Sequence, residues 1–505
     1  MQTKPSIKYL PAPFLAGVCI MILEMIGPRM MAPYIGATVI SWAAVITVIM
    51  GSMALGYRSG GAAADKNPDP RLLAARFACA GLYILCIGLF GKLFIQAVFM
   101  LLPLNFYALA LIYSLALFAV PCFMLSAASP FTVRLLIAAG GQESAGKTAG
   151  TVSAVSTAGC IAGAMLGGFI LISFLGVSAI LYSAAAVSLC CAVFLYFPSR
   201  RPRIINTALI VVSLAAVSVI HTLHDRAESV YETLYSTLTV GERTLTGGRS
   251  VRILSNNYFF SQGAQYTDSP YELTGGYTQF VFERAVFPET ASALIFGGGA
   301  YMLPSHLAYS RPDIAVDVVE IDPKMTALAS RYFRLLAGPF LRIFHNDARY
   351  AANLFLRDNR ARYDLILHDA YPSSLPPPAH LITAEFFSLA RRLLADDGVF
   401  AFNLLANPDS VLYASILATF QSAFPGGIAV YPRAGYTHPN PDAVFQTPTI
   451  MLLYSNRPGF YDSLDSFPRV IPTADGSILT DDFNPIELLT LRMLRHSLNP
   501  SARKR

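Results

Sequence analysis

The sequence predicts two architectures in one chain: a multi-pass α-helical membrane domain of about seven spans, and an α/β domain with a small β-subdomain. Its 505 residues are 54% hydrophobic and 13% charged, about half the charged fraction of an average soluble domain. Residues 1–222 hold 13 Lys and Arg against 4 Asp and Glu, whereas residues 223–505 hold 24 against 27. In the second half, short apolar runs alternate with helical patterns, which is typical of a doubly wound parallel sheet.

The first half carries seven apolar stretches, each close to the ~20 residues that a bilayer-spanning helix needs. These stretches are 11–27, 37–57, 73–99, 104–126, 149–175, 177–197 and 204–222. The first one starts too late and is followed by too many others to be a cleaved signal peptide. Pro121, Pro130 and Arg134 interrupt the pattern between 121 and 145, which indicates a bent helix end or a re-entrant segment.

Lysine and arginine predict which side of the membrane each connection faces, because they favour the cytoplasm. They gather at the N-terminus and after the second, fourth and sixth spans, so we expect a cytoplasmic N-terminus. Seven spans then place residue 223 on the opposite side. The side of the second half stays open: either one span is miscounted near 121–145, or that half works on the far side.

Three features of the first half go beyond hydrophobicity. Glu24 lies within the first span, five residues before Arg29, and an intramembrane carboxylate marks either a functional site or a structural ion pair. Glycines recur every four residues from Gly159 to Gly167, which favours close helix packing over a substrate path. The segment that ends at Arg134 places polar groups at membrane depth, where irregular backbone is buried or lines a cavity.

Metal, disulfide and nucleic-acid roles are disfavoured in the second half. All seven cysteines lie in the first half, so neither a disulfide framework nor a thiolate site is expected. The eight histidines show no metal-ligand spacing, and we expect His345 and His368 to pack or lie at the surface. The second half is mildly acidic without a basic stripe, which argues against nucleic acid as a partner. The expected partners are the lipid bilayer and small molecules.

Strand signals divide the second half into two domains. Residues 223–288 show strand-like patterns with Gly and Asn at the turns, which predicts a small β-subdomain. Residues 289–505 carry the α/β domain. Its predicted strands are 293–299, 316–322, 341–347, 363–369 and 399–405, followed by IAVYPR and TIMLLYS.

Small and acidic residues stand at the carboxyl ends of the first four of these strands, where such sheets bind ligands. In chain order they are Gly297, Gly298 and Gly299, then Glu320 and Asp322, then Asp347 with Ala348, and then Asp369 with Tyr371. Glu320 lies 23 residues after Gly297, about the spacing at which an acid meets ribose hydroxyls. The alternative is that these acids merely cap the following helices.

The glycine loop indicates a nucleoside without a bound phosphate. No Lys-Ser/Thr pair follows it as in a P-loop, and GGGAY does not match G-x-G-x-x-G. S-adenosylmethionine, or its decarboxylated form, held by carboxylates, fits these residues, and no metal is implied.

At these motifs the stretch 225–490 resembles the spermidine synthase (aminopropyltransferase) family. The whole chain resembles the bacterial form fused to a transporter-like membrane region. The matching motifs are GGGAYMLP (297–304), VVEIDP (318–323), HNDAR (345–349), YDLILHDAY (363–371), LTDDFNP (479–485), LEMIGPRMMAPYIGA (23–37) and ALGYRSGGAAAD (54–65). The resemblance implies a Rossmann-like, methyltransferase-type domain in a multi-pass protein of the bacterial inner membrane.

The resemblance also implies roles for individual residues. The three glycines would line the nucleoside, Glu320 would bind the ribose, and Asp347 with Ala348 would contact the adenine edge. Asp369 would be the catalytic acid/base residue, with Tyr371 in the same loop, and would accept a proton from an attacking amine. The leaving group would be methylthioadenosine.

The chain departs from the family pattern around the second substrate. Ala300 and Tyr301 stand where soluble synthases carry an acid for the cofactor's amine. Tyr277 and Gln279 are approximate candidates for the pair that grips a diamine.

Asp481 and Asp482 form the remaining acidic pair near the C-terminus. They either reach over the site or cap the next helix.

The sequence therefore predicts a membrane-integrated, aminopropyltransferase-like enzyme that acts on S-adenosylmethionine or its decarboxylated form and releases methylthioadenosine. Two alternatives stay open. One is an S-adenosylmethionine lyase without an acceptor. The other is a transporter of polyamine or nucleoside cargo with a sensing domain, for which Glu24, Arg29 and Arg134 are the membrane candidates. A homodimer is compatible with the sequence.

Overall fold

The computed structural model divides the chain into two compact units, residues 1–234 and 235–505. It describes residues 7–35, 39–101, 106–140, 145–197, 200–227, 229–245, 247–256, 260–336, 338–371, 377–432 and 449–498. The boundary lies twelve residues beyond position 222, because the helix that contains the last apolar stretch runs on to Ala227 and a short strand follows it.

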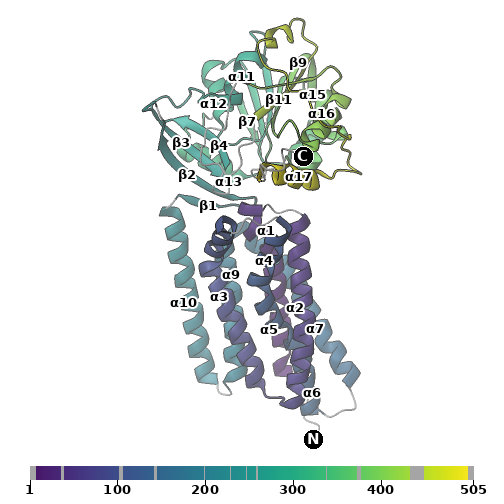
Figure 1. Cartoon of the computed structure of the whole chain (residues 1–505). Helices are drawn as coiled ribbons and strands as arrows, with labels where there is room; N and C mark the ends of the chain where they lie inside the picture. The colour runs from purple at the N-terminus through teal and green to yellow at the C-terminus, as the bar shows by residue number, and fades with distance from the viewer. Residues whose placement is uncertain are drawn as a thin grey trace. The chain divides into compact units, whose positions relative to one another are not determined.

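The first unit is a bundle of long helices (Figure 1). In chain order its elements are α1 (Pro11–Ile35), α2 (Val39–Lys66), α3 (Pro70–Leu101), α4 (Phe106–Ser114), α5 (Val120–Ser126), α6 (Ala128–Gly140), α7 (Ala145–Met165), α8 (Ile172–Phe174), α9 (Val177–Tyr196), α10 (Arg200–Ala227) and the strand β1 (Val230–Glu232). Two π-helical segments, Leu115–Ala119 and Leu166–Leu171, join α4 to α5 and α7 to α8.

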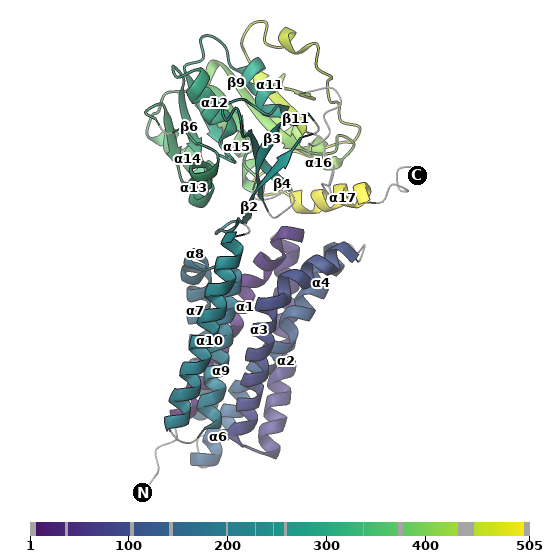
Figure 2. The same ribbon diagram turned by 90° about the vertical axis from the view of Figure 1, so that its left-hand side faces the viewer.

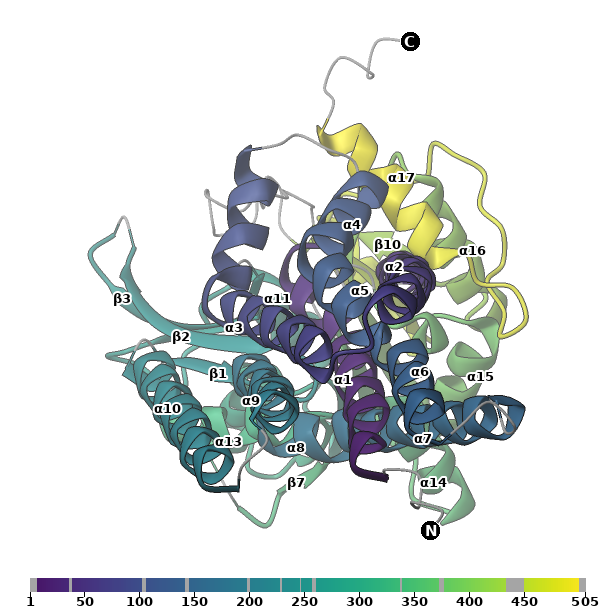
Figure 3. The ribbon, with the colours of Figure 1, turned by 90° about the horizontal axis from the view of Figure 1, so that it is seen from below.

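Helix α1 is the central helix of this unit, as the view along the bundle shows (Figure 3). It packs most extensively on α7, and the glycines of both helices make this contact close. A Cβ atom at Gly159 would lie 2.1 Å from the carbonyl oxygen of Phe14, and one at Gly163 would lie 2.5 Å from that of Val18. The glycine repeat therefore serves close packing of two backbones, the role that the sequence favoured.

Among the described residues, six helices are long and apolar enough to cross a membrane, one fewer than the seven predicted. They are Pro11–Ala32, Val39–Lys66, Pro70–Phe99, Tyr107–Ala138, Ala145–Leu171 and Val177–Tyr196. The difference is α10, whose apolar part is the shorter stretch Ile204–Val219. Arginines precede this stretch, and His, Asp and Arg follow it, so the helix is long but its apolar centre is not.

The irregular segment between 121 and 145 is helical over its described part. Pro121 and Pro130 lie near the starts of α5 and α6, and Pro121 follows the π-helical segment Leu115–Ala119 within a continuous run of helix. A local π adjustment of this kind accommodates a proline inside a membrane helix. Arg134 of α6 forms an ion pair with Asp65 of α2, with an N–O distance of 3.2 Å. The structure thus gives Arg134 a structural partner, and the segment is a bent helix.

A buried carboxylate fixes the end of the first unit. Glu232 of β1 forms an ion pair with Lys92 of α3 (2.5 Å) and accepts a hydrogen bond from the backbone N–H of Val177, the first residue of α9. Burial alone would raise the pKa of Glu232, but Lys92 and this N–H hold it below its usual value. Helix α10 runs beside α9 (Figure 2) and returns the chain to this end of the bundle.

The second unit holds two sheets and their helices. In chain order its elements are β2 (Thr237–Thr244), β3 (Ser250–Asn256), β4 (Phe260–Tyr266), α11 (Gly276–Ala285), β5 (Ser292–Phe296), α12 (Met302–Ser310), β6 (Ala315–Val319), α13 (Pro323–Tyr332), β7 (Leu341–Phe344), α14 (Ala348–Arg357), β8 (Tyr363–His368), α15 (Ala384–Leu393), β9 (Leu394–Leu405), α16 (Val411–Ala423), β10 (Ile428–Val430), β11 (Thr449–Ser455) and α17 (Ile486–Leu498).

The large sheet has the strand order β10-β11-β9-β8-β5-β6-β7. Strands β5 to β9 pair in parallel and are nearly continuous apolar runs, as expected for strands covered on both faces. The α/β prediction is therefore confirmed, with one correction. Strand β11 pairs antiparallel with both β9 and β10, because no helical pattern separates IAVYPR from TIMLLYS to carry a parallel crossover.

In the small sheet, β2 pairs antiparallel with β3, and β3 pairs antiparallel with β4, within the predicted β-subdomain. That range also contains the helix α11 and the end of α10.

In the core of the large sheet, His368 is buried, stacks on Phe402 with ring centroids 4.4 Å apart, and forms a hydrogen bond with the carbonyl oxygen of Leu381. Burial lowers its pKa to about 4, so this histidine is a neutral packing residue.

Adding one methyl group at the α1–α7 contact should destabilise the first unit. We expect Gly159→Ala to cost ~1–3 kcal/mol through overpacking against Phe14. Gly150→Ala, in the same helix, meets nothing within 4 Å and should gain up to ~1 kcal/mol of helix propensity. Thermal unfolding of the purified protein in detergent compares the two variants, and equal unfolding temperatures would contradict the close contact.

Candidate active site

Two cavities in the second unit meet at the carboxyl ends of the parallel strands. The first cavity, about 230 Å³, lies at the ends of β5, β6 and β7 and includes Glu320 and Asp347. The second cavity, about 160 Å³, lies among β4, the start of α11 and the ends of β8 and β9. Asp369 lines both cavities. The predicted strand-end residues are thus assembled around one carboxylate.

The glycine loop forms a floor shared by the two cavities. Gly297 has φ +96° and Gly299 has φ +52°, a region that residues with a Cβ rarely adopt. A Cβ atom at Gly297 would lie 2.3 Å from the carbonyl oxygen of Asp369, and one at Gly299 would lie 2.5 Å from that of Gln262. The loop therefore passes in direct backbone contact between the end of β8 and strand β4.

Glu320 is nine-tenths buried at the end of β6, and the backbone orients its carboxylate. Its Oε2 accepts the N–H of Gly298 (2.7 Å) and its Oε1 accepts the N–H of Asp322 (2.8 Å). Burial raises its pKa. Each oxygen keeps a further acceptor position, so the carboxylate can receive a pair of hydroxyl groups from a ligand in the first cavity.

Asp322 and Asp347 cap the helices that follow them, and both also line the first cavity. Asp322 Oδ1 accepts the N–H of Lys324, while its Oδ2 is buried and has no partner among the described residues. Asp347 Oδ1 accepts the N–H groups of Arg349 and Tyr350. Both side chains thus cap a helix, as the alternative predicted, and also line the first cavity.

His380 and Asp481 complete a polar rim beside Asp347. His380 Nε2 lies 2.7 Å from Asp347 Oδ2, and this contact, first among several, lowers the pKa of Asp347. Arg349 binds both carboxylate oxygens of Asp481 and the carbonyl oxygen of His380. Asp481 is therefore held by Arg349 and lines neither cavity.

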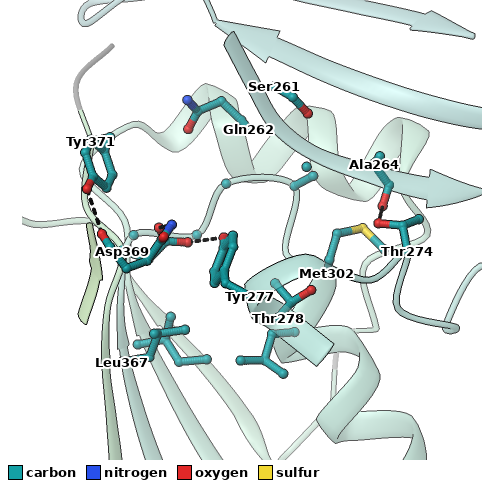
Figure 4. A pocket seen from close by; sticks show the side chains of 18 of the residues that line it. Ser261, Gln262, Ala264, Thr274, Tyr277, Thr278, Met302, Leu367, Asp369 and Tyr371 are labelled. Atoms are coloured by element: carbon teal, nitrogen blue, oxygen red, sulfur yellow. Dashed lines mark hydrogen bonds between the residues drawn. The ribbon is translucent and has the colours of Figure 1, made fainter. Parts of the chain in front are cut away.

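Two hydrogen bonds hold the carboxylate of Asp369. Tyr277 Oη donates to Oδ2, and Asn403 Nδ2 donates to Oδ1 at 2.8 Å; Figure 4 shows Tyr277 beside Asp369 in the second cavity. Burial raises the pKa of Asp369 to about 6, although both bonds act to lower it. A carboxylate with this pKa is a suitable proton acceptor near neutral pH.

Tyr371 supports the site through its hydroxyl group. Its Oη donates to the carbonyl oxygen of Asn403 (2.6 Å) and accepts the N–H of Leu405 (3.1 Å), and burial raises its pKa. The loop that follows it, which includes Pro372, Ser373 and Ser374, lies outside the described residues.

Three predicted substrate residues do not reach a cavity, and one does. Tyr277 lines the second cavity, whereas Gln279 is exposed and donates to Glu283 one turn along α11. Two positions along a helix turn a side chain by about 200°, which explains the difference. Asp482 is exposed and, like Asp481, precedes α17 without capping it, because Asn484 accepts the N–H of Ile486.

Two residues of the site, Asn403 and His380, were not predicted from the sequence. Asn403 stood out only as the polar residue inside the apolar run VFAFNLL, and its amide Oδ1 is buried without a partner among the described residues. His380 follows a proline-rich stretch and carried no signal. Ala300, at the position where the family has an acid, packs against β4, since a Cβ at Gly263 would lie 2.6 Å from the Cβ of Ala300.

Two further predictions concern metal ligands and the membrane residues of the first unit. Within the described residues, no group of three or more His, Cys, Asp or Glu side chains could hold a metal ion. Glu24 and Arg29 both lie in the central helix α1 and are half-buried.

Comparison with known proteins identifies relatives of part of the chain. No family model matches the chain. A polyamine aminopropyltransferase of Vibrio vulnificus is 32% identical over 218 residues, which cover 40% of this chain and 71% of that protein. The chain belongs to the polyamine aminopropyltransferase family. It is accordingly a spermidine synthase-like transferase.

Two further similarities cover slightly more of this chain at lower sequence identity. A probable polyamine aminopropyl transferase of Bifidobacterium longum is 27% identical over 245 residues, 46% of this chain and 51% of that protein. The crystal structure of a probable spermidine synthase from Corynebacterium glutamicum matches 45% of this chain and 79% of its own at 22% identity, with a TM-score of 0.38.

Gly297 combines a positive φ of +96° with a close backbone contact, so a side chain should be poorly tolerated there. Gly297→Ala adds left-handed strain and places a methyl group against the backbone of Asp369, so we expect binding of methylthioadenosine to be lost. Gly426→Ala is the matched control, because Gly426 has φ +82° in open space and should show only the strain, ~1–2 kcal/mol. Calorimetric titration and thermal unfolding separate the effects; intact binding by Gly297→Ala would refute this account of the loop.

Proposed function

We propose that the second unit transfers the alkyl chain of an S-adenosylmethionine-type sulfonium to an amine and releases methylthioadenosine. The observation that carries this proposal is the position of Asp369. Its carboxylate lies at the border between the first cavity, which three further carboxylates line, and the second cavity, where Asp369 is the one carboxylate among the described lining residues. A donor in the first cavity and an acceptor in the second would therefore meet at Asp369.

The first cavity suits a cationic nucleoside better than a phosphorylated one. Its described lining contains Glu320, Asp322, Asp347 and Asp369 and neither Lys nor Arg. The N-termini of α13 and α14, which could otherwise hold a phosphate, are capped by Asp322 and Asp347. Glu320 is oriented to receive the two ribose hydroxyls, and the acids attract a sulfonium.

The proposed reaction is a direct displacement. The lone pair of a neutral amine attacks the carbon next to the sulfonium, the carbon–sulfur bond breaks, and its electron pair goes to sulfur to give the thioether methylthioadenosine. The amine nitrogen becomes positively charged and passes a proton to Asp369. Tyr277 and Asn403 fix the carboxylate in one orientation, and positioning of both reactants supplies much of the rate.

Asp369→Asn should lower methylthioadenosine release by ~10²–10⁴-fold, the usual contribution of a general base. Incubation of the purified full-length protein with S-adenosylmethionine, and separately with its decarboxylated form, plus amines, followed by mass spectrometry of all products, measures the loss. Asp482→Asn is the control, because Asp482 is exposed and lines neither cavity. Full activity of a folded Asp369→Asn variant would contradict the proposal.

The pH profile gives a second readout of the same assignment. The hydrogen bond from Tyr277 lowers the pKa of Asp369, so Tyr277→Phe should raise that pKa above about 6. More of the carboxylate is then protonated at pH 6 than in the unchanged protein, and little at pH 8. The variant should thus lose more activity at pH 6 than at pH 8.

We also propose that the first unit is integrated in the inner membrane with its N-terminus in the cytoplasm. Large apolar side chains on its helices are exposed, among them Met50 (64%), Phe90 (59%), Phe169 (78%) and Leu209 (59%), and a lipid environment would cover them. The basic residues at the starts of α3 and α10, among them Arg71, Arg76 and Arg203, lie at one end of the bundle, whereas Glu232 lies at the opposite end with Lys92.

This orientation makes a specific prediction. Helix α10 has a short apolar stretch, but its 28 residues carry the chain from the basic end of the bundle to Glu232 at the other end. With the basic end in the cytoplasm and α10 as a seventh crossing, the chain leaves the bundle on the far side of the membrane. The protein should stay in membranes after alkaline carbonate washing, and a C-terminal tag should be cleaved by protease added to intact spheroplasts. Protection of that tag until the membrane is opened would instead place the second unit in the cytoplasm.

A further inference from the structure

The second cavity, next to Asp369, has a composition that bears on the acceptor. It is bounded by β4, the start of α11, the glycine loop and the ends of β8 and β9 (Figure 4). Among its described lining residues, Asp369 is the one carboxylate, and there is no Lys, Arg or His. The other polar groups are neutral hydroxyls and amides, such as Thr274, Thr278 and Asn403, and Leu367 and Met302 add apolar surface.

The other acidic side chains of the site do not line the second cavity. Glu320, Asp322 and Asp347 line the first cavity, where the donor would bind. Asp369 itself stands at the border of the two and already accepts bonds from Tyr277 and Asn403. One cationic nitrogen can therefore be matched near Asp369, but a second one, farther along the same chain, would be desolvated without a countercharge.

The size of the second cavity limits the acceptor as well. A cavity of roughly 150 Å³ holds a molecule such as benzene, with six heavy atoms. The second cavity, about 160 Å³, is of that size. It has room for a four-carbon chain with a group at each end, so charge and not length decides which end group is accepted.

We propose that the acceptor is a primary monoamine whose remaining part is uncharged, apolar or hydroxylated, and not a diamine. This rests on the proposed function. The amine nitrogen attacks the carbon next to the donor's sulfonium, the carbon–sulfur bond breaks with its electrons going to sulfur, and the proton released from nitrogen goes to Asp369. The uncharged end lies toward Thr274 and Met302, across the cavity from Asp369 in Figure 4.

The test compares acceptors of equal length that differ in one end group: 4-aminobutan-1-ol, n-butylamine and 1,4-diaminobutane. Each is given to the full-length protein with S-adenosylmethionine and, separately, with its decarboxylated form, and both methylthioadenosine and the alkylated amine are quantified. We expect kcat/KM for the amino alcohol or the alkylamine to exceed that for the diamine by at least about tenfold, equivalent to ~1.4 kcal/mol. An equal or higher value for the diamine overturns the inference.

A variant that adds the missing charge provides the matched test. Thr274→Asp places a carboxylate across the cavity from Asp369, and Thr274→Asn has the same shape without the charge. We expect the aspartate variant alone to shift the diamine-to-amino-alcohol ratio of kcat/KM at least about tenfold toward the diamine. Equal ratios in both variants overturn the charge argument. Absence of methylthioadenosine with every acceptor, in a protein that binds the nucleoside, overturns the proposed function and this inference with it.

Discussion

The contact between two strand ends, at Gly297 and Asp369, is the constraint on which the rest of the site depends. The N–H of Asp369 donates to the carbonyl of Phe296 (2.8 Å), and the N–H of Gly297 donates to that of Val319 (2.9 Å). The pairing of β8, β5 and β6 thus continues past the strands, and no side chain fits between the two backbones. Because of this contact, the carboxylate of Asp369 stands directly beside the glycine loop, where the two cavities join.

The acids around this contact fall into two energetic groups. Burial raises the pKa values of Asp369 and Glu320, so keeping them ionised near neutral pH costs folding free energy, as is common at functional sites. His380 and Arg349 instead lower the pKa values of Asp347 and Asp481. These two contribute stability above their unfolded-state pKa values and lose it as the pH falls through the folded ones. Asp347 and Asp481 therefore stabilise the fold near neutral pH, whereas ionised Asp369 and Glu320 reduce its stability.

Sequence patterns predicted which residues lie at the strand ends, but they did not predict the contacts between side chains. Parallel strands end at one edge of a sheet, so Glu320, Asp347 and Asp369 could be placed together from spacing alone. The partner of Asp369 on β9, Asn403, lay in an apolar run without local signal, and Gln279 faces away because helix rotation separates it from Tyr277. The place of such a side chain depends on its partner in the fold. Asp481 forms an ion pair with Arg349, a contact between residues 132 positions apart that no local sequence pattern predicts. In the first unit, composition located the helices, but the length of α10 depended on how its polar ends fold.

The distribution of charge also bears on the form in which an acceptor would react. Four carboxylates surround the first cavity and one is shared with the second. Once a sulfonium occupies the first cavity, it offsets the field of Asp369 and repels a further cation through a site of low dielectric. An amine then enters more easily as the neutral base, which is also its nucleophilic form. Under the proposed function, the bound sulfonium thus disfavours entry of the protonated amine, and Asp369 receives the proton only after the neutral amine has attacked.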